Sequence, residues 1–352
     1  MWSNQKDQRN PNNDNEVVSP PEDGISSITF SPAANFMAAT SWDQYVRIWE
    51  VTGSQWGGGN AQSQSKVIHK HTSPILCSGW SDTGSQVFFG GTDGQVKMWD
   101  LASNQCQQVG HHGGGVKAVF HIPQHQQLVS GSWDKSLKYW DLRNPNPNPT
   151  FAFSLPERCY TMDVKGHLMV VGTANRQILV FDIRSPQSPL KQITSPLKWQ
   201  TRCVACFSDM KGYFVGSIEG RVAVQNLDEA TASQKNFTFK CHRQNNSEVY
   251  AINSIAVHPT LGSFVTAGSD GCYHFWDKES KRRLKAMERT NESISCGAFN
   301  RDGSIYAYAV SYDWSKGCRS YNPQTTRNTI MLHSIAEIEV MAKSANNPTR
   351  RR

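Results

Sequence analysis

The chain has no long hydrophobic run. Within its 352 residues, no uninterrupted apolar segment reaches the ~18 residues that a membrane-spanning helix needs. The first residues also lack an apolar stretch behind a basic start, which is the pattern of a secretory signal. The sequence therefore predicts neither membrane insertion nor secretion.

Paired cysteines are missing as well. Nine cysteines are scattered without paired spacing, mostly inside expected strands, and this favours a reducing compartment. Cys203 and Cys206 form an isolated C-x-x-C, but residues three apart on a strand point to opposite faces. We interpret both as core residues rather than zinc ligands or a redox pair.

Motifs of catalysis are absent. The sequence contains no G-x-S-x-G, no H-E-x-x-H and no P-loop. The glycine-rich residues 110–117 enter an expected strand, so they lack the helix N-terminus that would hold a phosphate. The adjacent His111 and His112 have no distant partners that would complete a metal site. The sequence predicts no enzyme, no cofactor, no metal and no small-molecule substrate.

What the chain does have is a repeat. An acidic residue in a tight turn, or a stand-in, is followed six positions later by Trp or a stand-in. The pairs are Asp43 and Trp49, Asp93 and Trp99, Asp134 and Trp140, Asp270 and Trp276, and, in degenerate form, Asn175 and Phe181, and Glu219 and Gln225. A repeat of forty to fifty residues built from short strands predicts a WD40-type β-propeller.

Seven pairs of short apolar strands set the number of blades. They lie at residues 25–30 and 36–40, 75–80 and 86–90, 116–121 and 127–130, 159–164 and 168–172, 203–207 and 213–216, 252–257 and 263–267, and 294–299 and 305–310. Because one blade cannot bury both of its faces alone, the units must close into a ring. We therefore expect an all-β, seven-bladed propeller over residues 23–335.

The two termini are expected to lie outside this ring. Residues 1–22 are rich in Asn, Pro and Asp, which predicts disorder, although Val17 and Val18 are candidates for an edge strand. Residues 329–333 are the other candidate for the strand that closes the ring, and the sequence does not choose between the two. Residues 336–352 are expected to form a tail whose three terminal arginines are either a nuclear-targeting or RNA-contacting segment or a frayed end.

Three histidines and the repeat tryptophans have a structural interpretation. His71, His112 and His242 precede the first strands of blades two, three and six. Each is expected to hydrogen-bond the turn aspartate of its blade rather than to bind a metal. The repeat Trp fills the space between blades, and its indole N–H needs a buried partner.

Function is expected where large exposed side chains interrupt the repeat. We define the top face as the rim that carries the turns after the second strand of each blade. Trp42, Trp133 and Trp314 are additional tryptophans beside turn aspartates on this rim. For Trp42 and Trp133, capping of the ring is an equally good interpretation, whereas Trp314 lies in a blade that lacks the Trp-Asp ending altogether.

Blade five departs furthest from the repeat. Arg221 follows its turn, and residues 236–243 alternate aromatic and basic side chains up to Arg243. Basic groups beside exposed aromatics fit an acidic, partly apolar peptide, and they also fit single-stranded RNA. The net charge of +7 favours an anionic partner without identifying it.

Several longer strings are more specific than the repeat, and through them the chain resembles the mRNA-export WD-repeat family, the Rae/Gle nucleoporin-binding proteins. The strings lie at residues 19–26, 131–138, 155–160, 216–223, 236–243 and 311–317. The resemblance runs from about residue 16 to about residue 340.

The resemblance implies a non-enzymatic adaptor of the nucleus and nuclear pore that shuttles to the cytoplasm. Family members bind a hairpin-forming Gle-binding segment of an FG-repeat nucleoporin across the top face, contact RNA and mRNP, and act at the mitotic spindle. The implied nucleoporin contacts are Arg221, Phe239, Lys240, Arg243, Trp314 and Lys316, with Trp42 and Trp133 as additions. The implied RNA contacts are Lys240, Arg243, Lys316 and Arg319.

Two alternatives stay open at this point. A related mitotic-checkpoint family, which binds a similar hairpin in checkpoint kinases, resembles the chain at residues 217–222 and 239–243. Residues 236–238 and 312–317 favour the export family instead. The second alternative is a propeller that mainly binds RNA, and steep salt dependence with RNA alone would be its mark.

Overall fold

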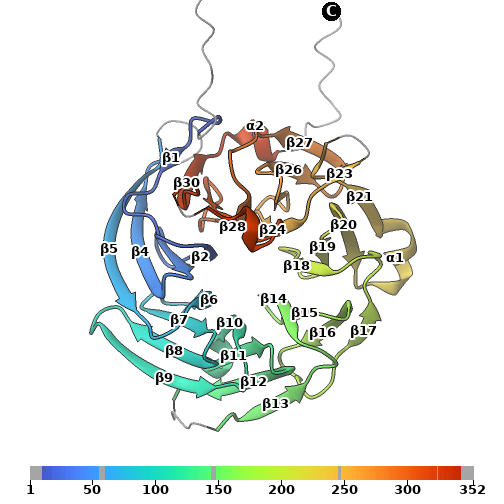
Figure 1. Cartoon of the computed structure of the whole chain (residues 1–352). Coiled ribbons are helices and arrows are strands. Elements are labelled where there is room, and N and C mark those ends of the chain that lie inside the picture. Colours follow the sequence, from blue (N-terminus) through green and yellow to red (C-terminus); the bar gives the residue numbers. More distant parts are fainter. Residues whose placement is uncertain (1–9, 55–59, 144–147, 245–246, 323, 342–352) are drawn as a thin grey trace, which may run out of the picture.

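The short apolar segments form the strands that the repeat predicts. The computed structural model describes residues 10–54, 60–143, 148–244, 247–322 and 324–341. Seven four-stranded antiparallel sheets surround a central axis, and a separate two-stranded ribbon lies beside them (Figure 1). The predicted seven-bladed β-propeller is confirmed.

The blades follow one another along the chain. Blade one comprises β2 (Ile25–Phe30), β3 (Phe36–Ser41), β4 (Tyr45–Thr52) and β5 (Gln62–Lys70). Blade two comprises β6 (Ile75–Trp80), β7 (Gln86–Gly91), β8 (Gln95–Asp100) and β9 (Gln105–His111). Blade three comprises β10 (Val116–Ile122), β11 (Gln127–Ser132), β12 (Ser136–Asp141) and β13 (Phe151–Ser154). Blade four comprises β14 (Cys159–Lys165), β15 (Leu168–Thr173), β16 (Gln177–Asp182) and β17 (Lys191–Thr194).

The second half of the ring has the same order. Blade five comprises β18 (Thr201–Cys206), β19 (Gly212–Ser217), β20 (Arg221–Asn226) and β21 (Phe237–Lys240). Blade six comprises β24 (Ile252–Val257), β25 (Phe264–Gly268), β26 (Tyr273–Asp277) and β27 (Arg282–Ala286). Blade seven comprises β28 (Ile294–Phe299), β29 (Ile305–Val310), β30 (Thr329–Ser334) and the N-terminal β1 (Asn15–Glu16).

The first strand of each blade lines the axis (Figure 1). Each of these inner strands breaks register once, near the end where it enters the ring from the top face. The residues at the break are Ser26, Leu76, Lys117, Tyr160, Arg202, Asn253 and Ser295. A bulge of this kind re-aims the side chain of the extra residue, and it recurs here once per blade.

Both termini contribute to the closure of the ring. β1 pairs with β30 in antiparallel register, with Asn15 opposite Leu332, and the Val17 N–H donates to the Ile330 carbonyl at 2.9 Å. The sequence did not decide which terminus supplies the closing strand, and in the structure both termini contribute one. The C-terminal segment is the third strand of blade seven, and the N-terminal segment is its outer strand.

A buried polar clasp holds the two ends together. His333 Nδ1 lies 2.7 Å from Asp14 Oδ1, and His333 Nε2 lies 3.0 Å from Glu339 Oε2 on α2 (Glu337–Val340). The hydroxyls of Tyr273 and Tyr308 donate to Asp14 Oδ2 at 3.0 and 2.7 Å. Burial alone would lower the pKa of His333, but its two carboxylate partners raise that pKa to about 9.

The clasp corrects the expected boundaries of the domain. Residues 10–22, which we expected to be disordered, carry the buried Asp14 and Val17. Residues 336–341, which we expected to belong to a tail, carry α2 and the buried Val340. Both segments are part of the propeller, while residues 1–9 and the terminal arginines lie outside the described residues.

Polar networks join the strands of blades three and six. Trp140 Nε1 donates to Ser130 Oγ at 2.8 Å, and Ser130 Oγ lies 2.7 Å from His112 Nε2. His112 Nδ1 lies 3.0 Å from Asp134 Oδ2, which completes a chain of hydrogen bonds from Trp140 to Asp134. Blade six repeats the arrangement with Trp276, Thr266, His242 and Asp270. The structural role predicted for His112 and His242 is confirmed, and His71 likewise lies 3.0 Å from Asp93.

Cys203 and Cys206 face the core as expected. The Cys203 thiol points to the Ile252 carbonyl of blade six at 3.5 Å, and the Cys206 thiol points to the Asp163 carbonyl of blade four at 3.6 Å. The two thiols therefore leave opposite faces of β18, and burial raises the pKa of Cys203 to about 12.

The helices are short. α1 (Glu229–Lys235) joins β20 to β21 and begins at Asp228, whose carboxylate accepts the Ala230 N–H at 3.1 Å. Among the described residues, no helix is both long and apolar enough to cross a membrane.

Candidate functional site

Exposed apolar side chains gather on the top face. Trp42, Ile218 and Trp314 lie in turns between second and third strands and are 41%, 40% and 46% exposed. Trp199 and Val249 lie in the connections that enter blades five and six and are 55% and 39% exposed. Exposed apolar groups surrounded by polar ones are typical of a surface that binds a partner.

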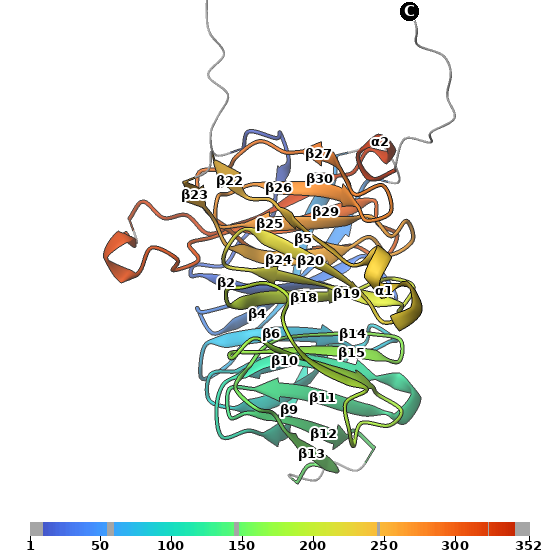
Figure 2. The same ribbon diagram turned by 90° about the vertical axis from the view of Figure 1, so that its right-hand side faces the viewer.

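The largest projection on this face is the connection between β29 and β30. Residues 311–322 and 324–328, here called the arm, extend away from the ring on the side of β22 (Arg243–Gln244) and β23 (Glu248–Val249), opposite α1 (Figure 2). Trp314 lies within the arm with its ring centroid 4.9 Å from that of Tyr321 and 5.4 Å from that of Tyr312. The three rings support one another, so the arm has a small aromatic core of its own.

A half-buried carboxylate fastens the arm to blade six. Asp313 Oδ2 accepts a hydrogen bond from Asn253 Nδ2 at 2.7 Å and another from the Ser269 hydroxyl. Burial raises the pKa of Asp313, but hydrogen bonds from Ser269, Asn253 and Ser315 outweigh burial and lower the pKa below its ordinary value. The ionised Asp313 therefore fixes the position of Trp314, the next residue in the chain.

The predicted cations of the arm are accessible. Lys316 and Arg319 are both exposed, and Arg319 lies on the short helical turn η2 (Cys318–Ser320). The carboxyl of Glu292, in the loop between blades six and seven, has a pKa raised by burial and partly lowered again by Lys316. Lys316 thus lies beside the ring at the base of the arm.

A second basic cluster belongs to blade five. Arg221 opens β20 and Lys240 ends β21, and the two residues are directly opposite each other in the sheet. Arg243 follows in the two-stranded ribbon and donates from Nη2 to the Glu219 carbonyl at 2.6 Å. Arg221 Nε lies 3.4 Å from the Glu219 carboxylate, so one acidic turn residue orients both arginines. We call Arg221, Lys240 and Arg243 the blade-five cluster.

Phe239 departs from our expectation. The alternation in β21 does place Phe237 and Phe239 on one face, but that face is turned inward. The ring of Phe239 packs 4.7 Å from Trp276 and 6.3 Å from Phe264, between blades five and six. Its structural effect is to hold β21 against blade six, and this corrects the expectation that the aromatic is exposed.

Trp42 and Trp133 differ from each other. Trp42 is exposed and only its edge approaches Gly24, where an added Cβ would lie 3.4 Å from the ring. Trp133 is half-buried, and its ring covers Gly115 so closely that a Cβ there would come within 2.7 Å. Capping of the ring therefore describes Trp133, while Trp42 stays available to a partner.

One cluster has the composition of a metal site. His242, Asp270 and His274 are buried, with ligand atoms within 4.8 Å of one another. Both nitrogens of His242 are already hydrogen-bonded, to Asp270 and to Thr266. Burial and the neighbouring His242 lower the pKa of His274 to about 3, so its ring is neutral. The cluster belongs to the polar network of blade six, which agrees with the structural interpretation of His242.

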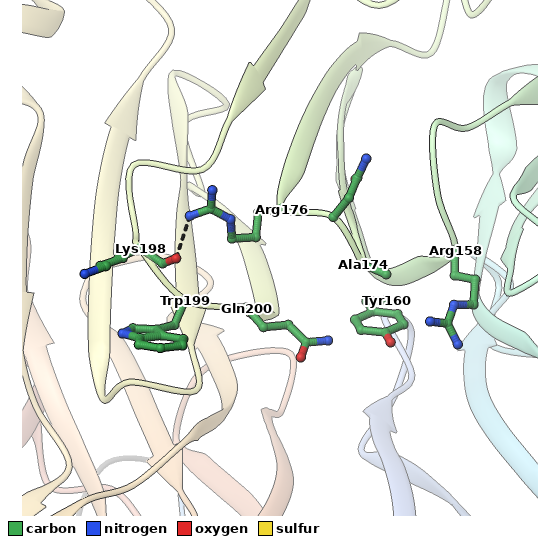
Figure 3. A pocket seen from close by; sticks show the side chains of 8 residues that line it. Arg158, Tyr160, Ala174, Arg176, Lys198, Trp199 and Gln200 are labelled. Carbon is green, nitrogen blue, oxygen red and sulfur yellow. Dashed lines mark hydrogen bonds between the residues drawn. The ribbon is translucent and has the colours of Figure 1, made fainter.

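The top face also has a hollow, away from the arm, that the sequence did not predict. This basin, of about 470 Å³, lies between blades four and five and is lined by Arg158, Tyr160, Asn175, Arg176, Lys198 and Trp199 (Figure 3). The residues come from three separate loops, so no single string in the sequence identifies them. An exposed Trp next to Lys in the loop before blade five was the signal available.

Comparison with known proteins agrees with this fold. The family model "WD domain, G-beta repeat" matches residues 16–50, 62–100, 104–141 and 233–277. "Protein RAE1" of Arabidopsis thaliana is 52% identical over 97% of both chains. "Poly(A)+ RNA export protein" of Schizosaccharomyces pombe is 47% identical over 93% of this chain and 92% of the relative.

A third relative gives the same result. "mRNA export factor GLE2" of Chaetomium thermophilum is 45% identical over 92% of this chain and 90% of the relative. These matches extend over nearly the whole length of the chain rather than over the repeat segments alone. The chain therefore belongs to the Rae1/Gle2 family of mRNA export factors.

Proposed function

We propose that this chain is a non-enzymatic adaptor in mRNA export that docks a Gle-binding hairpin of an FG-repeat nucleoporin across the top face at blades five to seven. The observation that carries the proposal is the arm, where ionised Asp313 positions the exposed Trp314 beside Lys316. An indole in a fixed position next to a cation matches a peptide that is acidic and partly apolar, because Trp supplies buried area and Lys attracts carboxylates.

The blade-five cluster supplies the complementary charge. Glu219 contacts both Arg221 and Arg243 and so fixes their positions. Both arginine side chains are half-buried, so part of each stays accessible. Guanidinium groups oriented in this way can pair with carboxylates in bidentate geometry. Trp42, on the far side of the arm in blade one, extends the surface, and Phe239 contributes only by supporting β21.

RNA contact is the second part of the proposal. Lys240, Arg243, Lys316 and Arg319 offer cations on one face of the ring, and the net charge of +7 adds a long-range attraction for phosphates. We infer that this contact is tolerant of sequence. Location at the nuclear pore, exchange with the cytoplasm and a role at the mitotic spindle rest on the family resemblance.

Calorimetry of the whole chain with synthetic hairpins tests the docking. The hairpin of an FG nucleoporin should bind tightly at physiological salt, and that of a checkpoint kinase should bind weakly. Trp314→Ala and Arg221→Glu should each weaken the nucleoporin hairpin by about 2 kcal/mol. Leu190→Ala and Arg184→Glu, which change exposed residues away from the top face, are the matched controls.

The outcomes separate the candidate functions. Unchanged affinity in Trp314→Ala and Arg221→Glu, with folding intact, would show that the hairpin docks elsewhere or not at all. A preference for the kinase hairpin would place the chain with the checkpoint propellers. Binding of neither hairpin, together with RNA binding that falls steeply with salt, would identify a propeller that mainly binds RNA.

A further inference from the structure

The basin between blades four and five is separate from the arm and the blade-five cluster. Its walls are the loop entering blade four, the turn of blade four and the loop entering blade five (Figure 3). Trp199 and Lys198 stand on one side, and Tyr160 and Arg158 on the other (Figure 3). The hollow is open to solvent on the top face.

A change in the repeat explains why the basin is cationic. Blades two, three and six have Asp93, Asp134 and Asp270 in the turn, whereas blade four has Asn175 at that position. Asn175 accepts the Thr173 hydroxyl at 2.7 Å and so keeps the local turn without a negative charge. Among the described residues that line the basin, three carry a positive charge and none carries a carboxylate.

The loop that carries Trp199 is held in position from two sides. Arg176 donates from Nη1 to the carbonyls of Leu197 and Lys198 at 3.2 and 2.5 Å. The Glu219 carboxylate accepts the Lys198 N–H at 3.1 Å. Trp199 is nevertheless 55% exposed, so a fixed backbone presents an uncovered indole to solvent.

The opposite wall combines a ring with a cation. The Arg158 guanidinium lies 5.6 Å from the centroid of Tyr160, and its side chain is 52% exposed. Glu157 lies 3.6 Å from Arg158 but is shared with Lys135 at 3.2 Å, so it neutralises Arg158 only in part. Each wall therefore offers one aromatic face and one accessible positive charge.

Positive charge continues from the basin toward the axis. Tyr160 is the residue at the register break of β14, and Lys117 and Arg202 occupy the same position in β10 and β18. Burial lowers the pKa of Lys117, and the nearby Arg202 lowers it further, because two cations oppose each other at this place.

We propose that the basin binds single-stranded RNA, with one base stacked on Trp199 and the flanking phosphates contacting Lys198 and Arg158. This inference rests on the RNA contact of the proposed function and adds a site that is separate from the arm. RNA fits better than an acidic peptide, because the apolar surface here consists of open aromatic faces rather than a closed pocket for an anchoring side chain.

The test uses a fluorescent single-stranded oligoadenylate of about 12 nucleotides and the full chain. Trp199→Ala should weaken binding about tenfold with an unchanged salt dependence, because stacking carries no charge. Lys198→Gln should reduce the slope of log affinity against log salt by about 0.7, the value for one phosphate on a single strand. Leu190→Ala and Lys235→Gln, at exposed positions away from this face, should leave both quantities unchanged.

The same variants are titrated with the nucleoporin hairpin and with a short polyglutamate peptide. Loss of RNA affinity with unchanged hairpin affinity supports the basin. If Lys316→Gln weakens RNA and the basin variants do not, the basin inference is overturned while the RNA contact of the arm stands. If the basin variants lose polyglutamate and keep RNA, the basin is a docking site for an acidic protein segment. If the wild-type chain binds no oligoadenylate, RNA contact itself is refuted, whatever the hairpin does.

Discussion

Blades three and five share a backbone plan and differ in what occupies their polar positions. In blade three, Trp140, Ser130, His112 and Asp134 form one continuous hydrogen-bonded chain. Burial raises the pKa of Asp134, but hydrogen bonds from His112 and Ser136 outweigh burial and lower it. The polar side chains of this network are thus hydrogen-bonded to one another rather than presented to a partner.

Blade five has lost this network and kept its core. Glu219 and Gln225 replace the Asp and the Trp, while Phe207 and Phe214 are buried with their centroids 4.6 Å apart. Apolar packing therefore compensates for the missing tryptophan. Glu219 orients Arg221 and Arg243 at the surface, and its carboxylate also accepts the Lys198 N–H. The comparison indicates that the residues typical of the repeat stabilise the ring. The residues that replace them in blade five are the ones placed to contact a partner.

The largest effect should follow from removing the network of blade three. Trp140→Ala deletes a fully buried indole and leaves Ser130 with one hydrogen-bond partner fewer. We expect the free energy of unfolding to fall by about 4 kcal/mol, as for other buried aromatic residues. Chemical denaturation followed by fluorescence and circular dichroism measures the change.

The matched control is Trp42→Ala, which removes an exposed indole from the top face. Its free energy of unfolding should stay within about 0.5 kcal/mol of the wild type. Equal destabilisation by the two variants would contradict the division between structural and contacting tryptophans.

The second effect concerns the clasp that closes the ring at blade seven. The folded-state pKa of His333 is raised to about 9 by Asp14 and Glu339, against an ordinary value of 6.5. A raised pKa means that the stabilisation is fully present below pH 6.5 and is lost as the pH rises through about 9. The contribution is on the order of 3 kcal/mol at its maximum.

His333→Gln keeps a side chain that can hydrogen-bond but removes the proton. The variant should be less stable than the wild type at pH 6, and the difference should shrink toward pH 9. A constant difference between pH 6 and pH 9 would show that the clasp is neutral in the folded chain.

A smaller effect should separate the arm from the ring. Asp313→Ala removes the acceptor of Asn253 and Ser269, and the arm then loses its fixed position above blade six. We expect affinity for the nucleoporin hairpin to fall about tenfold, because Trp314 must be ordered again on binding. Limited proteolysis should cut the variant faster within residues 311–328. Thr325→Ala, exposed on the same arm, is the control and should change neither quantity.

The difference between repeat and departure also explains what the sequence could predict. The spacing of turn Asp and Trp and the pairs of apolar strands both depend on local strand length. Together they predicted seven blades, and they made the turn Asp the expected partner of His112 and His242. The inward turn of Phe239 depends on Trp276 in the next blade, and no alternation within β21 reveals it. Asp14 looked like part of a disordered segment, because its partners lie more than 250 residues away. The basin was missed for the same reason, since three loops must meet to form it.

The smallest perturbation is chemical labelling of cysteine, which compares the reactivity of the thiol on the arm with that of the thiols in the ring. Among the nine cysteines, Cys318 on the arm is exposed, whereas the others are buried or half-buried. Burial raises the pKa of Cys77, Cys159 and Cys296 to about 12, so these thiols hold their protons and react slowly. Iodoacetamide at neutral pH should therefore modify one thiol rapidly, and Cys318→Ser should abolish that fast phase without changing the free energy of unfolding.

Bound nucleoporin hairpin should slow the reaction, because Cys318 is only four residues from Trp314. Protection by the hairpin would place the arm in the interface, and a rate unchanged at saturation would place the hairpin away from η2.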